Sequence, residues 1–123
     1  MEAEEVTSGN WSDLVLSSKT PVVVMFYSPT CPHCTVMKPH FDKYAQEYSG
    51  RVRFLRLNVT ENIRTARDYG VMSTPTFKFF CQSRSVQELV GAAYPPLVKK
   101  LVDDMLSYGA VCADKSTRIA GYS

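Results

Sequence analysis

An unbroken apolar run followed directly by two closely spaced cysteines is the feature that most restricts the fold of this chain. Residues 22–27 read Val-Val-Val-Met-Phe-Tyr, a β-branched and aromatic run typical of a strand buried on both faces in a parallel sheet. Residues 28–30 end the run, and Cys31-Pro32-His33-Cys34 follows. Residues 35–48 then repeat apolar side chains at helical spacing, so the cysteines are predicted to open an amphipathic helix.

The position of the two cysteines at a helix start predicts their chemistry. Backbone N–H groups there lack intrahelical partners and the helix dipole favours negative charge, so Cys31 is expected to hold a thiolate. Cys34 lies one turn later on the same face, within reach of a disulfide. Pro32 suits a first helical turn, where its missing N–H costs little. The pattern indicates thiol–disulfide chemistry, with Cys31 as the nucleophile and Cys34 as the resolving thiol.

The same spacing also occurs as one half of a zinc site, which needs a second pair of ligands. The other two cysteines, Cys81 and Cys112, are far apart in sequence rather than paired. His33 and His40 could complete a set only on paper, because both belong to the same short stretch of chain. We therefore expect no metal.

Composition and charge exclude several classes of function. The chain has 123 residues, one domain by length, and a net charge of +2 with Lys99-Lys100 as its only basic pair, so neither nucleic acid nor a membrane surface is expected as a partner. The first residues are acidic and no window is apolar enough for a signal peptide or a membrane span. We expect a cytoplasmic protein, although a secreted protein whose signal had been removed would read in the same way.

Predicted helices and strands alternate along the chain. Asn10 or Ser12 can cap a short helix through Leu16, and Thr60 can cap a third helix that Gly70 ends. The remaining elements are a strand over 52–59, an antiparallel hairpin formed by strands 76–81 and 86–90, and a last helix that opens at Pro95-Pro96. The expected domain covers residues 1–107, followed by a tail over 108–123 without periodicity.

In this order the motifs resemble the thioredoxin family over roughly residues 10–107. The residues that carry the resemblance are the apolar strand before Cys31, Pro39, Leu57-Asn58-Val59 with Asn62, Tyr69-Gly70-Val71, Thr74-Pro75-Thr76 and Val90-Gly91-Ala92. The resemblance implies an α/β fold, a three-layer α/β/α sandwich around a mixed sheet of four or five strands. It also implies a kink at Pro39, a cis peptide between Thr74 and Pro75, and substrate contacts from Thr74, Pro75, Gly91 and Ala92.

Two departures from the family pattern bear on function. Thr30 and Pro32-His33 stand where thioredoxins usually carry Trp and Gly-Pro, and Pro-His is the dipeptide of periplasmic disulfide oxidases, so Pro32 and His33 are expected to tune the redox poise. The helical insertion of those oxidases has no room between Cys31 and Pro75. Met25 stands where thioredoxins typically hold a buried acid that manages the proton of the second cysteine.

The resemblance implies an enzyme that reduces protein disulfides, takes electrons from a separate reductase, needs no cofactor beyond the Cys31–Cys34 disulfide, and is expected to be a monomer. Two alternatives stay open: a disulfide oxidase or isomerase tuned by His33, and a module that binds clients without redox turnover.

The two remaining cysteines are weighed separately. Cys81 ends an apolar strand and is expected to be a buried structural thiol. Cys112 could be an exposed incidental thiol, a partner for Cys81, or a third redox cysteine.

Overall fold

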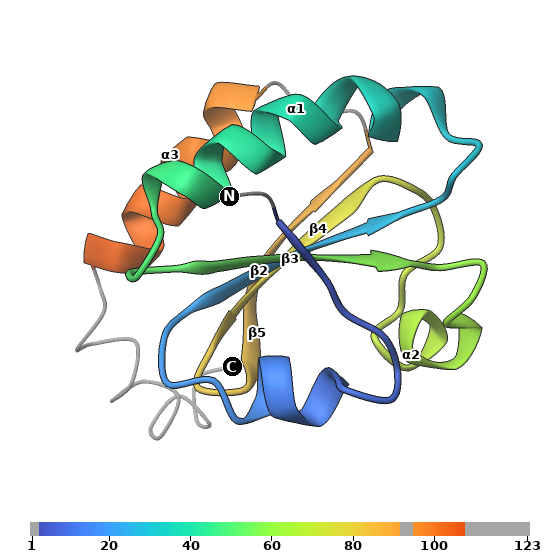
Figure 1. Ribbon diagram of the computed structural model, residues 1–123, viewed down its shortest axis with the longest axis horizontal. Helices are drawn as coiled ribbons and strands as arrows, with labels where there is room; N and C mark the ends of the chain where they lie inside the picture. The colour runs from blue at the N-terminus through green and yellow to red at the C-terminus, as the bar shows by residue number, and fades with distance from the viewer. Residues whose placement is uncertain (1–2, 92–94, 108–123) are drawn as a thin grey trace.

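A five-stranded mixed sheet forms the centre of the molecule in the computed structural model, which describes residues 3–91 and 95–107 (Figure 1). The strand order is β1-β3-β2-β4-β5. Strand β3 pairs in parallel with both β1 and β2. Strand β4 pairs antiparallel with β2, and β5 pairs antiparallel with β4. Their bounds are β1 Glu4–Glu5, β2 Val22–Tyr27, β3 Arg53–Asn58, β4 Thr76–Cys81 and β5 Arg84–Val90. The predicted mixed α/β sheet is confirmed.

Helices cover both faces of this sheet and make three layers (Figure 1). The long helices α1, Pro32–Glu47, and α3, Pro95–Ser107, pack on one face. The short helix α2, Ile63–Asp68, and η1, one turn of π-helix over Ser12–Leu16, pack on the other. Among the described residues, no helix is both long enough and apolar enough to cross a bilayer.

Strand β2 supplies both hydrophobic cores because neighbouring side chains of a strand point to opposite faces. Val23 and Met25 pack with α1 and α3. Val22, Val24 and Phe26 pack on the other face, in the cluster that also holds Trp11. All five of these β2 side chains are at most 1 % exposed. Burial on both faces explains the continuous apolar run in the sequence.

Pro39 lies inside α1, as predicted, so the helix continues across it rather than starting anew. Proline cannot donate a backbone hydrogen bond, so the turn before Pro39 lacks one bond of the helical ladder. Cys34 and Met37 are buried before this point, and Phe41 and Tyr44 after it. The helix therefore contributes to the core on both sides of the proline.

The antiparallel pairing of β4 with β2 fixes what lies at each end of the sheet. Thr76 pairs with Phe26, so the chain just before β4 lies beside the end of β2, where α1 begins. Cys81 ends β4 at the opposite end of the sheet, near Val22. The hairpin to β5 turns through Gln82 and Ser83, which both have positive φ as a tight two-residue turn requires.

Two details of the sequence prediction were wrong, and one strand was missed. Neither Asn10 nor Ser12 caps η1: Trp11 occupies the N-cap position without a side-chain bond, and Asn10 accepts from the Thr7 N–H at 2.7 Å instead. Thr60 does not cap α2: Asn62 occupies the N-cap position, and the N–H and hydroxyl of Thr60 both donate to Asn58. Gly70 does adopt the predicted left-handed conformation, with φ of 71°. The missed strand, β1, is two exposed residues long and carries no apolar pattern.

Candidate active site

The start of α1 places the two cysteines of the C-x-x-C motif together. Cys31 is the N-cap residue, with extended backbone at φ −88°, and its Sγ accepts a hydrogen bond from the backbone N–H of Cys34 at 3.2 Å. Pro32 takes a first-turn position, as predicted. Cys31 is half-buried and Cys34 is buried, and both are free thiols. One sulfur thus faces the surface more than the other.

Hydrogen bonds around Cys31 favour its thiolate. Burial raises the pKa of the Cys31 thiol, but hydrogen bonds from the side chains of Cys34 and Thr74 and from the backbone N–H groups of Cys34 and His33 outweigh burial and leave the pKa below its ordinary value. The unpaired donors of a helix start therefore act in the direction that the sequence predicted.

Cys34 has the opposite tendency. Burial, and then the hydrogen bond with Cys31, raise the pKa of the Cys34 thiol to about 11. A thiol with this pKa keeps its proton near neutrality. The pair is thus divided into one sulfur prepared to attack and one that holds a proton until it is needed.

The segment before β4 completes the site. The peptide between Thr74 and Pro75 is cis, as the family resemblance implied, and the Thr74 side chain lies within hydrogen-bond reach of both sulfurs. The backbone N–H of Gly91 donates to the Pro75 carbonyl oxygen at 2.8 Å. Three of the predicted substrate residues are therefore brought together, and the fourth, Ala92, lies outside the described residues.

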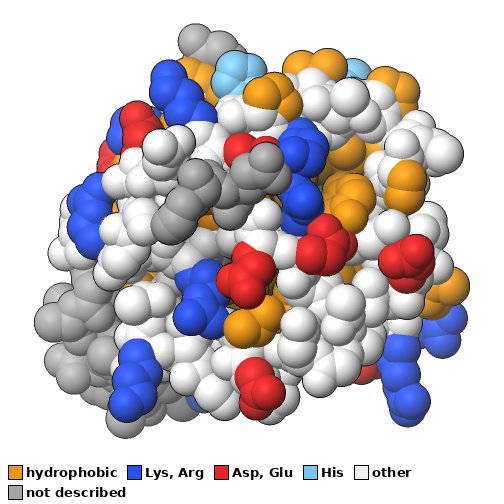
Figure 2. All heavy atoms as spheres, in the orientation of Figure 1, with side chains coloured by type: hydrophobic (Ala, Val, Ile, Leu, Met, Phe, Trp, Pro, Cys, Tyr) orange, Lys and Arg blue, Asp and Glu red, His pale blue; other side chains and the backbone are white. Residues whose placement is uncertain are grey.

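The side chain of His33 is exposed, as is Pro32. Figure 2 shows hydrophobic and histidine side chains exposed along the upper edge of the molecule, over α1. Val36, a residue of α1, is 67 % exposed. The backbone N–H of His33 hydrogen-bonds Cys31, whereas a tuning role for its side chain stays a prediction.

A cavity of about 220 Å³ opens beside Cys34, between α1 and the ends of β2 and β3. Met25, at the position where the family typically holds a buried acid, forms part of its wall. Two cationic side chains, Lys38 of α1 and Arg56 of β3, also line it. The rest of the lining is Tyr27, Ser28, Pro29 and Thr35.

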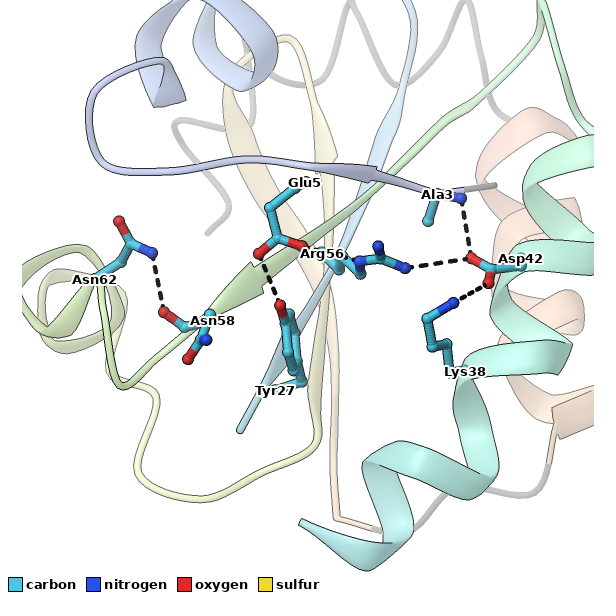
Figure 3. Close-up of polar contacts among 8 residues, drawn as sticks. All are labelled: Ala3, Glu5, Tyr27, Lys38, Asp42, Arg56, Asn58 and Asn62. Carbon is cyan, nitrogen blue, oxygen red and sulfur yellow. Dashed lines mark hydrogen bonds and ion pairs between the residues drawn. The ribbon is translucent and has the colours of Figure 1, made fainter. Parts of the chain in front are cut away.

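The two cations belong to a polar network that joins β1, β2, β3 and α1 (Figure 3). Arg56 Nε lies 2.9 Å from a Glu5 carboxylate oxygen, and the Tyr27 hydroxyl donates to the same carboxylate at 2.8 Å. Asp42 accepts from the Ala3 N–H at 3.0 Å and from Lys38 at 2.7 Å.

Sequence reasoning missed this network. One available signal was the presence of two arginines, Arg53 and Arg56, in the strand predicted over 52–59, although this pattern does not distinguish between them.

Cys81 requires a correction. It is buried, at 4 % exposed, as expected, but it is disulfide-bonded rather than a free thiol. Its position at the far end of β4 separates it from Cys31 and Cys34. Cys112, the remaining cysteine of the sequence, lies outside the described residues. Within the part of the chain that the structure describes, no group of three or more His, Cys, Asp or Glu side chains could hold a metal ion.

Comparison with known proteins identifies relatives over most of the chain. The thioredoxin family model matches residues 2–104. Thioredoxin 1 of Nostoc sp. is 37 % identical over 73 % of this chain and 84 % of its own length, and the thioredoxin of Synechocystis sp. is 38 % identical over 72 % and 82 %.

A chloroplastic M-type thioredoxin of Pisum sativum is 37 % identical over 74 % of this chain but 53 % of its own length. The chain thus spans about half the length of this relative.

Proposed function

This chain belongs to the thioredoxin family, and we propose that it is a thiol–disulfide oxidoreductase that reduces protein disulfides. The observation that carries the proposal is that the pKa values of the Cys31 and Cys34 thiols are shifted in opposite directions. One thiol has its pKa lowered by hydrogen bonds at a helix start, and the other keeps its proton through burial. A nucleophile and a resolving thiol need these two properties.

The proposed reaction has two exchange steps. The Cys31 thiolate attacks a sulfur of the substrate disulfide, forms a mixed disulfide and releases one substrate thiolate. Cys34 then attacks Cys31, forms the Cys31–Cys34 disulfide, and releases the second substrate sulfur as a thiol that carries the proton of Cys34. The substrate gains two electrons, and the enzyme loses two.

We further propose that the substrate lies along Thr74, Pro75, Gly91 and Ala92. Support comes from the contact of Thr74 with both sulfurs and from the bond between Gly91 and Pro75, which hold this segment beside the motif. An extended peptide placed there would pair with backbone groups, as a strand added to a sheet does.

The cycle needs a donor that returns two electrons to the Cys31–Cys34 disulfide. We propose a separate reductase for this step, no cofactor other than the disulfide, and action as a monomer in the cytoplasm, where thiols are kept reduced. Support for the reductase and for the disulfide as sole cofactor comes from the family. The disulfide of Cys81 points the other way on the compartment, because disulfides are rare in the cytoplasm.

The first experiment is a redox titration of the Cys31–Cys34 pair against defined glutathione ratios. A potential in or below the range of about −220 to −320 mV supports a reductase. A potential well above it contradicts reduction as the working direction and favours an oxidase or isomerase. The strong hydrogen bonding of Cys31 makes this alternative worth testing, because a stabilised thiolate makes the disulfide more oxidising.

A trapping experiment tests turnover separately. The Cys34→Ser variant should retain substrate proteins as mixed disulfides that a reductant releases, whereas the Cys31→Ser/Cys34→Ser double variant should retain none. If the first variant captures no more than the double variant, the chain is a binding module rather than an oxidoreductase.

A further inference from the structure

The resolving step presents a specific problem in this chain. Cys34 must give up a proton that burial holds tightly, and the acid that would normally manage that proton is replaced by Met25. Of the described residues that line the cavity beside Cys34, none carries a carboxylate. The phenol of Tyr27 also lines the cavity, but burial and its bond to Glu5 raise its pKa to about 12, so it stays protonated.

Arg56 lies next to the position of the missing acid. Met25 and Arg56 are partners in the parallel register of β2 and β3, so their side chains leave the sheet on the same face, toward α1. Both line the cavity. Lys38 reaches the cavity from α1, one turn beyond Cys34, where residues four apart share a helix face. Arg56 thus lies beside Met25, the position where the family typically holds an acid, and Lys38 lies on α1.

The carboxylates that form ion pairs with these two cations do not line the cavity. Glu5 of β1 holds Arg56 through Nε, and Asp42 of α1 holds Lys38 at 2.7 Å. Neither carboxylate lines the cavity, and Glu61, whose charge acts on Tyr27, does not line it either. Arg56 Nη1 is buried, has no hydrogen-bond partner and is 3.7 Å from Asp42. Two cationic side chains and no carboxylate are therefore found among the described residues that line the cavity beside Cys34.

We propose that Arg56, assisted by Lys38, is the positioning residue of the resolving step: its charge stabilises the Cys34 thiolate as that thiolate forms, in place of an acid that accepts the proton. The inference rests on the proposed function.

In this step the Cys34–Cys31 bond forms, the bond from Cys31 to the substrate sulfur breaks, and the Cys34 proton ends on the departing substrate sulfur. No further oxidant or reductant is needed.

A two-phase reaction separates this role from that of Cys31. A neutral aromatic disulfide, 4,4′-dithiodipyridine, should release one absorbing pyridinethione when Cys31 attacks and a second when Cys34 resolves the mixed disulfide. Stopped-flow absorbance then measures both rates on one protein. Because the reagent has no charge, loss of a cation does not change its attraction to the site.

In the Arg56→Met variant the first phase should keep its rate and the second should slow. An opposite charge nearby shifts a thiol pKa by about 1 to 3 units, and each unit slows exchange only about three- to fourfold because a more basic thiolate is a better nucleophile. The second phase should therefore slow roughly threefold to sixtyfold, and its pH profile should move to higher pH. Arg56→Lys should restore most of the rate.

Two further variants keep the test decisive. Lys38→Met removes the second cation from a side chain that is 45 % exposed, so it should fold even if Arg56→Met does not, and its second phase should also slow. Arg53→Met is the matched control, because Arg53 is half-buried on the same strand but does not line the cavity.

Unchanged second-phase rates and pH profiles in both cavity variants would overturn the inference, as would equal slowing in Arg53→Met. Absence of the first phase from the wild-type protein would contradict the proposed function instead.

Discussion

The two ends of the central sheet each hold a cysteine site, and the two sites differ in nearly everything except burial. Cys31 and Cys34 follow β2 at one end, whereas Cys81 closes β4 at the other, because β4 runs antiparallel to β2. Cys34 and Cys81 are equally buried, at 4 % exposed. Cys34 is nevertheless a free thiol beside a second thiol, and Cys81 is already bonded.

The difference shows that the local backbone, more than burial, separates an exchanging thiol from a structural one. At the start of α1, backbone N–H groups have no partner within the helix and can bind a sulfur anion. Cys81 lies in an extended strand, paired with Arg84 across the hairpin, where the backbone groups serve the ladder. We expect chemistry at the first end and stability from the second, and four experiments test that division.

Cys31→Ser should have the largest effect. A hydroxyl cannot replace the thiolate as nucleophile, so disulfide reduction should fall to the uncatalysed background, while the unfolding midpoint stays close to that of the wild type. Residual turnover measured with a protein disulfide substrate would mean that another cysteine can start the reaction, and the division between the two ends would fail.

Alkylation should distinguish the two thiols of the motif. A pH of 7 is about four units below the Cys34 pKa of about 11, so only about one molecule in ten thousand carries a Cys34 thiolate. The pKa of Cys31 is lowered instead, so Cys31 carries a larger fraction of thiolate. Iodoacetamide at pH 7 should modify Cys31 alone, and peptide mass spectrometry should locate the label. Labelling of Cys34 at a comparable rate would contradict the assigned roles.

Cys81→Ala should affect stability and leave exchange intact. Loss of a disulfide typically removes about 2 to 4 kcal/mol from the free energy of unfolding, which a urea titration measures through its midpoint. Alanine avoids the buried hydroxyl that serine would introduce. Reducing the wild-type disulfide provides the matched comparison. A drop in the exchange rate without a drop in stability would reverse the functions given to the two ends.

His33→Ala should have the smallest effect. Its backbone N–H, which bonds Cys31, is retained by alanine, and only the exposed imidazole is lost. The reduction potential should fall by about 30 mV or less, which corresponds to about 1.4 kcal/mol for two electrons. A larger fall would show that the imidazole itself sets the poise, as the Pro-His pattern suggests.

Sequence reasoning located most elements where the pattern was strong. Strands β2 and β4 fall on the predicted residues, because their apolar runs reflect burial on both sides. Strand β1 could not be found in this way, since Glu4 and Glu5 are exposed and are held by pairing with Leu55 and Arg56. The predicted helix caps were wrong for a related reason, because the side chains of Asn10 and Thr60 form other hydrogen bonds. Asn10 accepts from the Thr7 N–H, and the Thr60 hydroxyl donates to Asn58.

The candidate site likewise has features that the sequence predicts and features that it does not. The C-x-x-C motif, its helix and the cis bond before Pro75 could be anticipated, because each belongs to a local motif or to the family pattern. The contacts of Arg56 with Glu5 and Asp42 could not, since these residues lie far apart in sequence and no spacing links them. The expectation of a free structural thiol at Cys81 was wrong, and a bond to Cys112 was only one of the alternatives left open, because disulfide connectivity cannot be read from sequence.

Pro39 divides α1 into two units of local stability. Because it donates no backbone bond, the carbonyl oxygen of Thr35 lacks its usual partner four residues on, and the ladder is interrupted between the thiols and the turns anchored by Phe41 and Tyr44. The turns that carry the two thiols can then open without breaking the backbone hydrogen bonds of the helix beyond Pro39. Their amide protons should exchange with solvent faster than those beyond the proline, and changes in sulfur bonding should be confined mainly to the turns before Pro39.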